Sequence, residues 1–270
     1  RMSDFLQTMA AASAERASGV SRTFSSADFD KPLLPVSTAG FGIIAEIKER
    51  SPAEGDLRLP DNDRLTQARR YIDGGAAAIS VLTEPTRFDG DISHLESVAA
   101  AAPETPVMRK DFLVDPVQVS EARKAGASGV LLIAAMLSDR RLRELLDRAW
   151  EHGLFVLLES FDADDLVRSS RLLDNSGDAE RCESGQLLIG INTRNLRTLE
   201  VDGRRLERLA PALPDAVCVA ESGLHGPDDA ERVAGWGYQM ALVGTALMKS
   251  ADPTGLLAAM HVAGTRALAA

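Results

Sequence analysis

Several short apolar runs in this chain end directly at charged side chains. At the ends of two of these runs lie residues suited to acid–base chemistry on an anion. Lys110 follows the run Val107–Arg109. Glu46 and Lys48 lie at the end of an earlier run, and residues two apart in a strand point to the same side. A lysine at the end of a buried strand can neutralise an anion, donate a proton or form a Schiff base, and a salt bridge at the rim is the alternative.

Similar positions recur after other apolar runs, where the chain has carboxylate, amide, guanidinium and hydroxyl groups. These residues are Thr83, Glu84, Asp111, Glu159, Asn192, Arg194, Glu221 and Ser222, and Ser51 lies just beyond Lys48. If they converge, their desolvation is costly unless they pair with one another or with a ligand. We therefore expect a functional site in which some of the charges belong to the scaffold.

Two later segments have the pattern of a phosphate-binding site. Ser222-Gly223 and Gly244-Thr245 each place a glycine and a hydroxyl group directly after an apolar run. Glycine lets an oxyanion approach backbone N–H groups, and the positive end of a following helix favours a dianion. Each glycine alone is compatible with a tight turn, but the two segments together predict a phosphate site.

These side chains must be positioned by the regular pattern that begins after Gly40, in which apolar runs alternate with helical segments. The runs are Gly42–Ile47, Ala78–Leu82, Val107–Arg109, Gly129–Ile133, Phe155–Leu158, Leu187–Ile191, Val217–Ala220 and Ala241–Val243. The helical segments are Asp63–Asp73, Asp91–Ala101, Pro116–Ala125, Asp139–Glu151, Ala163–Leu173, Gly203–Leu209, Pro227–Ala234 and a last one after Pro253. Buried parallel strands that are each followed by a helix predict a single α/β domain, a (β/α)8 TIM barrel.

A doubly wound open sheet is the alternative, but it often carries a G-x-G-x-x-G pattern after its first strand, where this chain has Lys48–Pro52. We expect the barrel to comprise residues 41–270, and residues 1–40 to form an N-terminal helical extension. The alanine-rich residues 3–18 predict a helix within that extension. The polar residues 174–186 predict a loop.

The composition limits which classes of partner this chain can bind. The net charge of -10 argues against a nucleic-acid binder, but it does not exclude a small anionic substrate. No apolar run approaches the ~20 residues of a membrane span. The two cysteines, Cys182 and Cys218, fit neither a metal motif nor a disulfide framework, which favours the cytoplasm. We expect a cytoplasmic monomer.

Taken together, these motifs resemble the indole-3-glycerol phosphate synthase family of tryptophan biosynthesis. The matching segments are Ala45–Gly55 (A-E-I-K-x-x-S-P-x-x-G), Val81–Glu84 with Phe88 and Gly90, Arg109–Phe112, Ile191–Leu196, Ala220–Gly223 and Leu242–Met248. The resemblance covers residues from about Phe41 to Pro253, and the family also has a helical segment before its first strand.

The resemblance implies a carboxy-lyase that converts 1-(2-carboxyphenylamino)-1-deoxyribulose 5-phosphate to indole-3-glycerol phosphate, with release of carbon dioxide and water and without a metal or cofactor. It implies that Lys110 is the general acid and that Lys48, helped by Arg194, pairs with an anionic end of the substrate. Two cationic neighbours would lower the pKa of Lys110. Glu159 and Glu46 are the candidates for a base or for cation stabilisation.

The resemblance also implies substrate contacts. Asn192 and Glu221 would bind hydroxyl groups, Ser51 would lie in the substrate site, Ser222, Gly223, Gly244 and Thr245 would hold the phosphate, and Phe88 and Phe112 would line the anthranilate ring. Ordinary loop packing is the alternative for the two phenylalanines. The chain departs from the family at Ser160-Phe161, where Val-His is usual, at Glu49 and Arg50, and at Thr193.

Other functions fit these residues less well. Phosphoribosylanthranilate isomerases use Cys and Asp where this chain has Glu46 or Lys48 and Asn192. A Schiff-base aldolase that uses Lys110 is a further alternative. A divergent paralogue that acts on a related sugar phosphate, or a noncatalytic ligand-binding paralogue, also stays open, although the presence of Lys110, Glu159 and Lys48 together argues against the noncatalytic form.

Overall fold

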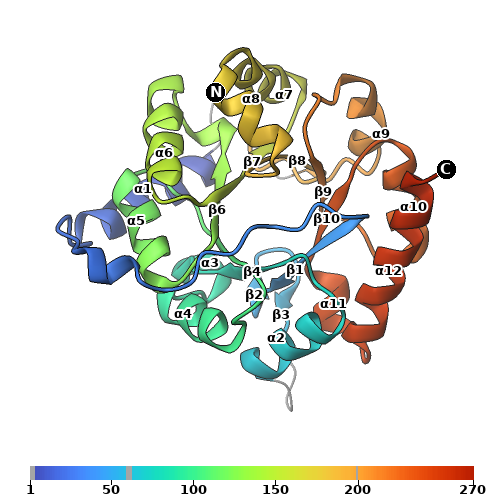
Figure 1. Ribbon diagram of the computed structural model, residues 1–270, viewed down its shortest axis with the longest axis horizontal. Helices are drawn as coiled ribbons and strands as arrows, with labels where there is room; N and C mark the ends of the chain where they lie inside the picture. The colour runs from blue at the N-terminus through green and yellow to red at the C-terminus, as the bar shows by residue number, and fades with distance from the viewer. Residues whose placement is uncertain (1–3, 59–62, 199) are drawn as a thin grey trace.

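The computed structural model describes residues 4–58, 63–198 and 200–270, and its centre is a closed barrel of parallel strands surrounded by helices (Figure 1). The strands pair in the order β1-β10-β9-β8-β7-β6-β5-β4, and the ring closes between β4 and β1. All of these pairs are parallel. The predicted (β/α)8 barrel is therefore confirmed.

The barrel strands lie where the apolar runs predicted them. They are β1 (Gly42–Ile47), β4 (Ala78–Leu82), β5 (Val107–Lys110), β6 (Gly129–Ile133), β7 (Phe155–Ser160), β8 (Leu187–Asn192), β9 (Cys218–Glu221) and β10 (Met240–Val243). Every residue of these strands is buried except Lys110, which ends β5 and is partly exposed. Strands that are covered on both faces have this continuous apolar pattern.

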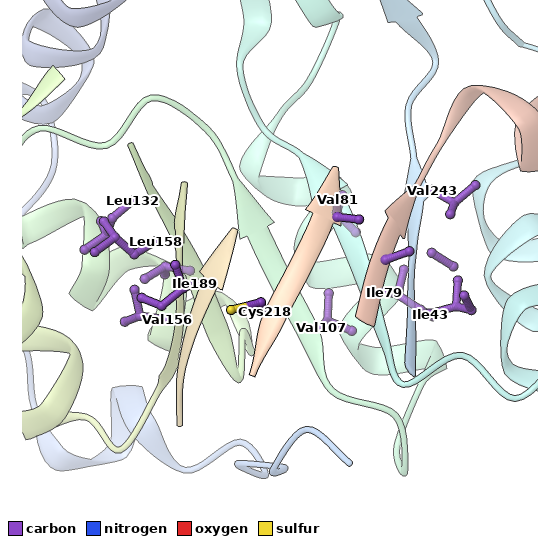
Figure 2. Packing of buried hydrophobic residues seen from close by; sticks show 14 of the residues in the cluster. Ile43, Ile79, Val81, Val107, Leu132, Val156, Leu158, Ile189, Cys218 and Val243 are labelled. Atoms are coloured by element: carbon purple, nitrogen blue, oxygen red, sulfur yellow. The ribbon is translucent and has the colours of Figure 1, made fainter. Parts of the chain in front are cut away.

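Successive side chains of each strand alternate between two apolar clusters. Figure 2 shows outward-facing residues, such as Ile43, Val81 and Val156, which pack against the helices. The inward-facing residues Ile44, Met108, Leu157, Leu188, Val219 and Met240 fill the barrel interior. Two positions further along β1, β5, β7 and β9, the inward-facing residues are Glu46, Lys110, Glu159 and Glu221, so the polar cluster rests on a packed apolar floor.

The outer helices follow the strands. They are α2 (Arg64–Asp73), α4 (Ile92–Ala101), α5 (Pro116–Ala125), α6 (Asp139–Glu151), α7 (Ala163–Ser170), α9 (Arg205–Leu209), α10 (Pro227–Gly235) and α12 (Pro253–Leu268). Several have an aspartate cap, because Asp63, Asp91 and Asp115 accept hydrogen bonds from backbone N–H groups of the first turn. Gly126 ends α5 in the left-handed conformation, with φ of 100°.

One predicted loop is wrong. Residues 174–186 contain α8 (Ser176–Glu183), which follows the 3-10 turn η3 (Arg171–Asp174). The buried side of α8 has Asp178 and Cys182, which form no apolar stripe, so hydrophobic periodicity does not reveal a helix. Asp178 is buried and accepts hydrogen bonds from Arg143 (2.5 Å) and from the indole N–H of Trp150 (3.1 Å).

Short elements that the sequence pattern did not predict follow the carboxyl ends of the strands. They are the hairpin β2 (Arg50–Ser51) and β3 (Gly55–Asp56), α3 (Pro85–Phe88), η2 (Ala134–Met136) and α11 (Thr245–Lys249). A further short turn, η4 (Ala210–Ala212), follows α9. Before β1, the chain forms α1 (Asp4–Ser18) and η1 (Ser26–Phe29). Leu6 and Met9 of α1 are buried in the same cluster as the barrel interior, so α1 packs onto the barrel.

Candidate active site

The centre of the site is a lysine–glutamate–lysine cluster built by β1 and β5. Lys110 Nζ lies 3.2 Å from Glu46 Oε2, and Lys48 Nζ lies 3.5 Å from Glu46 Oε1. Glu46 is 2% exposed, and Ser80 on β4 also donates a hydrogen bond to it (3.3 Å). The two sequence segments that first suggested chemistry therefore meet, and Glu46 holds both ammonium groups in place.

The charges around Lys110 differ from the expectation. Burial lowers the pKa of Lys110, but Glu46, Glu159 and Glu221 together raise it above its ordinary value. Burial raises the pKa of Glu46, and the charges of Lys110 and Lys48 outweigh this effect and lower it. The prediction that cationic neighbours lower the pKa of Lys110 is thus wrong, because the charges of Glu46, Glu159 and Glu221 outweigh the effect of burial.

Glu159 on β7 and Glu221 on β9 lie on the same side of the barrel interior, and both are 1% exposed. Glu159 is level with Gly190 of β8, and Glu221 is level with Asn192. Because Gly190 has no side chain, the carboxyl group of Glu221 occupies the space beside it. The missing side chain brings Glu221 close to Glu159.

Asn192 at the end of β8 connects three segments of the mouth. Its Oδ1 accepts hydrogen bonds from Ser222 Oγ (2.8 Å) and from the backbone N–H of Arg194 (2.9 Å). Arg194 is half-buried, and its backbone pairs with Val201 in an isolated bridge. Asn192 therefore fixes Ser222 of the predicted phosphate loop relative to β8.

Sequence reasoning missed Arg205, which supports this connection from outside the strand. Arg205 is 6% exposed, and its Nη1 donates hydrogen bonds to the carbonyl oxygens of Asn192 (2.9 Å) and Thr193 (2.6 Å). Burial lowers the pKa of Arg205. The available signal was an arginine at the start of α9 just after a barrel strand, but nothing in the sequence pairs it with backbone carbonyls.

The predicted phosphate loops have the expected backbone form. Ser222 and Gly223 both have positive φ, 67° and 77°, and the position of Ser222 is one that non-glycine residues rarely adopt. Thr245 begins α11 directly after Gly244. A Cβ atom on Gly244 would lie 2.9 Å from Glu46 Oε1 and 3.4 Å from Lys48 Nζ, so this loop lies against the charged cluster.

Aromatic side chains line another side of the mouth. Phe112 is buried, and the centroid of its ring lies 6.1 Å from that of Phe88 on α3. Phe5 of α1 packs edge-on against Phe112, with centroids 6.0 Å apart. The structure thus places the two predicted phenylalanines together and adds Phe5, which the sequence gave no reason to select.

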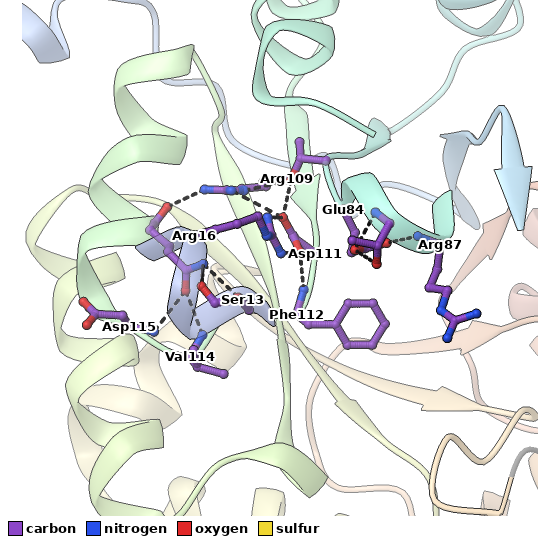
Figure 3. A network of polar contacts seen from close by, with 12 residues as sticks. Ser13, Arg16, Glu84, Arg87, Arg109, Asp111, Phe112, Val114 and Asp115 are labelled. Carbon is purple, nitrogen blue, oxygen red and sulfur yellow. Dashed lines mark hydrogen bonds and ion pairs between the residues drawn. The ribbon is translucent and has the colours of Figure 1, made fainter. Parts of the chain in front are cut away.

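Asp111, next to Lys110, belongs to the scaffold. It is buried and accepts two hydrogen bonds from Arg16 of α1 (2.8 and 2.7 Å), one from Thr83 (2.6 Å) and one from the Phe112 N–H (2.7 Å), as Figure 3 shows in part. Burial raises the pKa of Asp111, and the hydrogen bonds and charges of Arg16 and Arg109 more than offset this effect and lower it. The network ties the N-terminal helix to the end of β5.

Glu84 and Ser51 also have local roles in the backbone. Glu84 caps α3 and accepts hydrogen bonds from the N–H groups of Thr86 (2.8 Å) and Arg87 (2.7 Å). Ser51 is buried in the β2–β3 hairpin, and its Oγ accepts a hydrogen bond from the N–H of Glu54 (3.1 Å). Some of the polar residues at strand ends are therefore scaffold, as expected.

Within the part of the chain that the structure describes, no group of three or more His, Cys, Asp or Glu side chains is arranged to hold a metal ion. None of the helices in residues 4–58, 63–198 and 200–270 is both long and apolar enough to cross a membrane.

The sequence model for indole-3-glycerol phosphate synthase matches residues 6–260. The chain belongs to the indole-3-glycerol phosphate synthase family. A relative of that name from Nocardioides sp. is 47% identical over 239 residues, which cover 87% of this chain and 86% of the relative. Another of the same name from Mycobacterium leprae is 44% identical over 228 residues, which cover 84% of this chain and 78% of the relative.

Solved structures with low sequence identity share the barrel. A 3-hexulose-6-phosphate synthase from Salmonella typhimurium covers 84% of this chain with a TM-score of 0.63 and 17% identity, and the match spans 99% of that chain. This likeness concerns the fold alone.

Within the indole-3-glycerol phosphate synthase fold of this chain, Phe161 occupies the position where the family usually has histidine. Phe161 is fully buried next to Ser160, and its backbone N–H donates a hydrogen bond to Asp165 (3.0 Å). The guanidinium carbon of Arg197 lies 6.0 Å from the centroid of its ring. Packing and a neighbouring cation therefore hold this loop.

Proposed function

We propose that this chain catalyses the indole-3-glycerol phosphate synthase reaction, in which an aromatic carbon attacks a ketone and carbon dioxide and water are then lost. The observation that carries the proposal is the cluster of Lys110, Glu46 and Lys48, which lies beside Gly244 of the phosphate loop. A proton donor and a dianion site at this spacing suit a phosphorylated keto substrate.

Lys110 is the proposed general acid for ring closure. The ketone oxygen gains a proton as the new carbon–carbon bond forms, and the raised pKa of Lys110 keeps the ammonium group protonated at neutral pH. The ion pair with Glu46 fixes the direction of the donor. A substrate anion near Lys110 would favour the ammonium form further, so Lys110 enters ring closure as a proton donor.

The roles proposed for the remaining site residues follow from where each lies relative to Lys110 and to the phosphate loop. Lys48, close to Gly244, neutralises an anionic group of the substrate together with Arg194. Ser222, Gly223, Gly244 and Thr245 hold the phosphate group, and Asn192 and Glu221 bind the hydroxyl chain near it. Phe88 and Phe112 pack on the anthranilate ring, with Ser51 at the rim. Glu159 is the base for the dehydration step, and Glu46 stabilises the cations.

We also propose that the chain acts as a cytoplasmic monomer that consists of one barrel domain, residues 41–270, with residues 1–40 as a helical extension. Light scattering at assay concentration tests this point, and a dimer that dissociates with loss of activity would contradict it.

The activity is tested by incubating the purified chain with 1-(2-carboxyphenylamino)-1-deoxyribulose 5-phosphate and following the fluorescence of indole-3-glycerol phosphate. The expected result is saturable product formation with one carbon dioxide released per indole. Fluorescence that does not rise, while the folded chain still binds phosphate, would contradict the proposed reaction. Borohydride trapping of a keto substrate on Lys110 would instead support the aldolase alternative.

A further inference from the structure

The carboxyl group of Glu221 is buried in the barrel without a hydrogen-bond donor. Glu221 is 1% exposed, and neither of its side-chain oxygen atoms has a donor among the residues that the structure describes. A buried carboxylate without a donor or a counter-ion is costly. The group must therefore either bind a proton or be stabilised by a neighbour.

The carboxyl group of Glu159 is that neighbour. Gly190 lies between the two glutamates, because Glu159 is level with Gly190 on the adjoining strand and the Glu221 carboxyl group fills the space that a Gly190 side chain would take. Two acceptor groups placed together repel each other if both are charged. They attract each other if one of them holds a proton, since that proton forms a hydrogen bond between them.

The cations nearby are already engaged. Lys110 forms an ion pair with Glu46 at 3.2 Å, and Lys48 contacts the other oxygen of the same carboxylate at 3.5 Å. Within the described residues, no ion pair joins either lysine to Glu159 or Glu221. Three buried carboxylates face two ammonium groups, so one bound proton makes the cluster electrically neutral.

We propose that Glu159 and Glu221 share one proton before substrate binds, so that the pair acts as both the acid and the base when water is lost. This inference rests on the proposed function. Glu159 and Glu221 both contact the substrate, and the two share the acid and base roles. Gly190 makes the pair possible by leaving room for the second carboxyl group.

The pair can supply and take up both protons that the dehydration step moves. The C–O bond of the ring hydroxyl group breaks, and the hydroxyl leaves as water with the shared proton. The C–H bond on the neighbouring ring carbon breaks, its electron pair forms the C=C bond of the indole, and its proton passes to the pair. The pair returns to its starting state and needs no further reactant.

The electrostatics of Glu221 agree with this arrangement. Burial and the charge of the neighbouring Glu159 carboxyl group raise the pKa of Glu221 well above its ordinary value, and the charge of Lys110 does not reverse the shift. The charge of Glu46 adds to the rise. The pair loses its proton when the pH rises through this raised pKa, so the dehydration rate falls on the alkaline side.

Infrared spectroscopy of the unliganded enzyme tests the shared proton directly. At pH 7, the wild type should show the carbonyl stretch of one protonated carboxyl group. Glu159→Gln and Glu221→Gln should each lose it, because the proton needs both partners. The matched control Glu144→Gln, on the outer surface of α6, should keep it. A wild type without the signal, or a signal that survives in either site variant, would overturn the shared proton.

A single-turnover experiment tests the role of the pair and distinguishes it from the proposed function. In the wild type, carbon dioxide release and indole fluorescence should rise together. In Glu221→Gln, carbon dioxide release should persist while indole formation slows by ~10²–10⁴-fold, the usual effect of losing a general acid. Equal slowing of both signals would overturn the role of the pair, whereas a wild type that makes no indole would instead overturn the proposed function.

Discussion

Arg16 in the N-terminal helix donates two hydrogen bonds, of 2.8 and 2.7 Å, to Asp111, which directly follows Lys110 in the chain. Asp111 is buried, whereas Arg16 is partly exposed. The first helix of the chain therefore supports the strand end that carries the proposed general acid. This contact joins residues that are 95 positions apart.

Arg16→Met should destabilise the protein and slow the reaction. The buried Asp111 would keep its bonds to Thr83 and Arg109 but lose its bidentate partner, which should cost about 1–3 kcal/mol of unfolding free energy. Urea unfolding measures this change, and the fluorescence assay measures the rate. Arg22→Met is the matched control, because Arg22 pairs with Asp115 at 3.0 Å on the exposed surface and its loss should leave the unfolding free energy nearly unchanged. Equal costs for both variants would contradict a structural role for the Arg16 contact.

Arg205→Met should lower kcat more than it raises KM. The guanidinium group holds the backbone carbonyls of Asn192 and Thr193, so its loss releases the end of β8 and disturbs the contact between Asn192 and Ser222. Arg205→Lys keeps one donor and should recover part of the rate. The expected loss is about tenfold to a hundredfold, on the scale of one or two hydrogen bonds to a charged group. Steady-state kinetics that leave kcat and KM unchanged would contradict a positioning role for Arg205.

Gly244→Ala should weaken substrate binding. The new methyl group would lie 2.9 Å from Glu46 Oε1, so either the phosphate loop or the charged cluster must shift. We expect KM and the inhibition constant of inorganic phosphate to rise by about tenfold, equal to about 1.4 kcal/mol. Gly226→Ala is the control, because no atom lies within 4 Å of its new Cβ. Phosphate inhibition that is identical in both variants would place the phosphate site elsewhere.

Phe161→His should change kcat/KM by less than about tenfold and leave the acidic limb of the pH profile unmoved. Phe161 is buried and packs in an apolar cluster, where a histidine would add at most one hydrogen bond of about 0.5–1.5 kcal/mol. A pH–rate profile of both enzymes measures the limb. A shift of that limb by about one pH unit or more would mean that residue 161 tunes the base.

Much of the barrel was predictable because its strands are continuous apolar runs between capped helices. The polar residues at the strand ends were predictable for the same reason, since parallel strands bring their carboxyl ends to one mouth. Helix α8 was not, because its buried face carries Asp178, whose partners Arg143 and Trp150 lie far away in the sequence.

The sequence predicted which residues lie in the site better than it predicted the direction of their pKa shifts. The direction of the pKa shift of Lys110 depends on which side chains lie nearest, and strand register decides that. The same holds for Glu221, whose closeness to Glu159 depends on Gly190 in the strand between them. Arg16 binds a carboxylate that is distant in the sequence, and Arg205 binds backbone carbonyl groups. Neither contact produces a local sequence motif that could have predicted it.

The most direct test of the account is the rate of indole-3-glycerol phosphate formation by Lys110→Met. The variant keeps the length and apolar stem of the side chain but has no proton to donate, so the fold should persist by circular dichroism. The rate should fall by ~10²–10⁴-fold, whereas the surface variant Lys124→Met should match the wild type. A Lys110→Met enzyme with activity close to the wild type would contradict the assignment of Lys110 as the general acid.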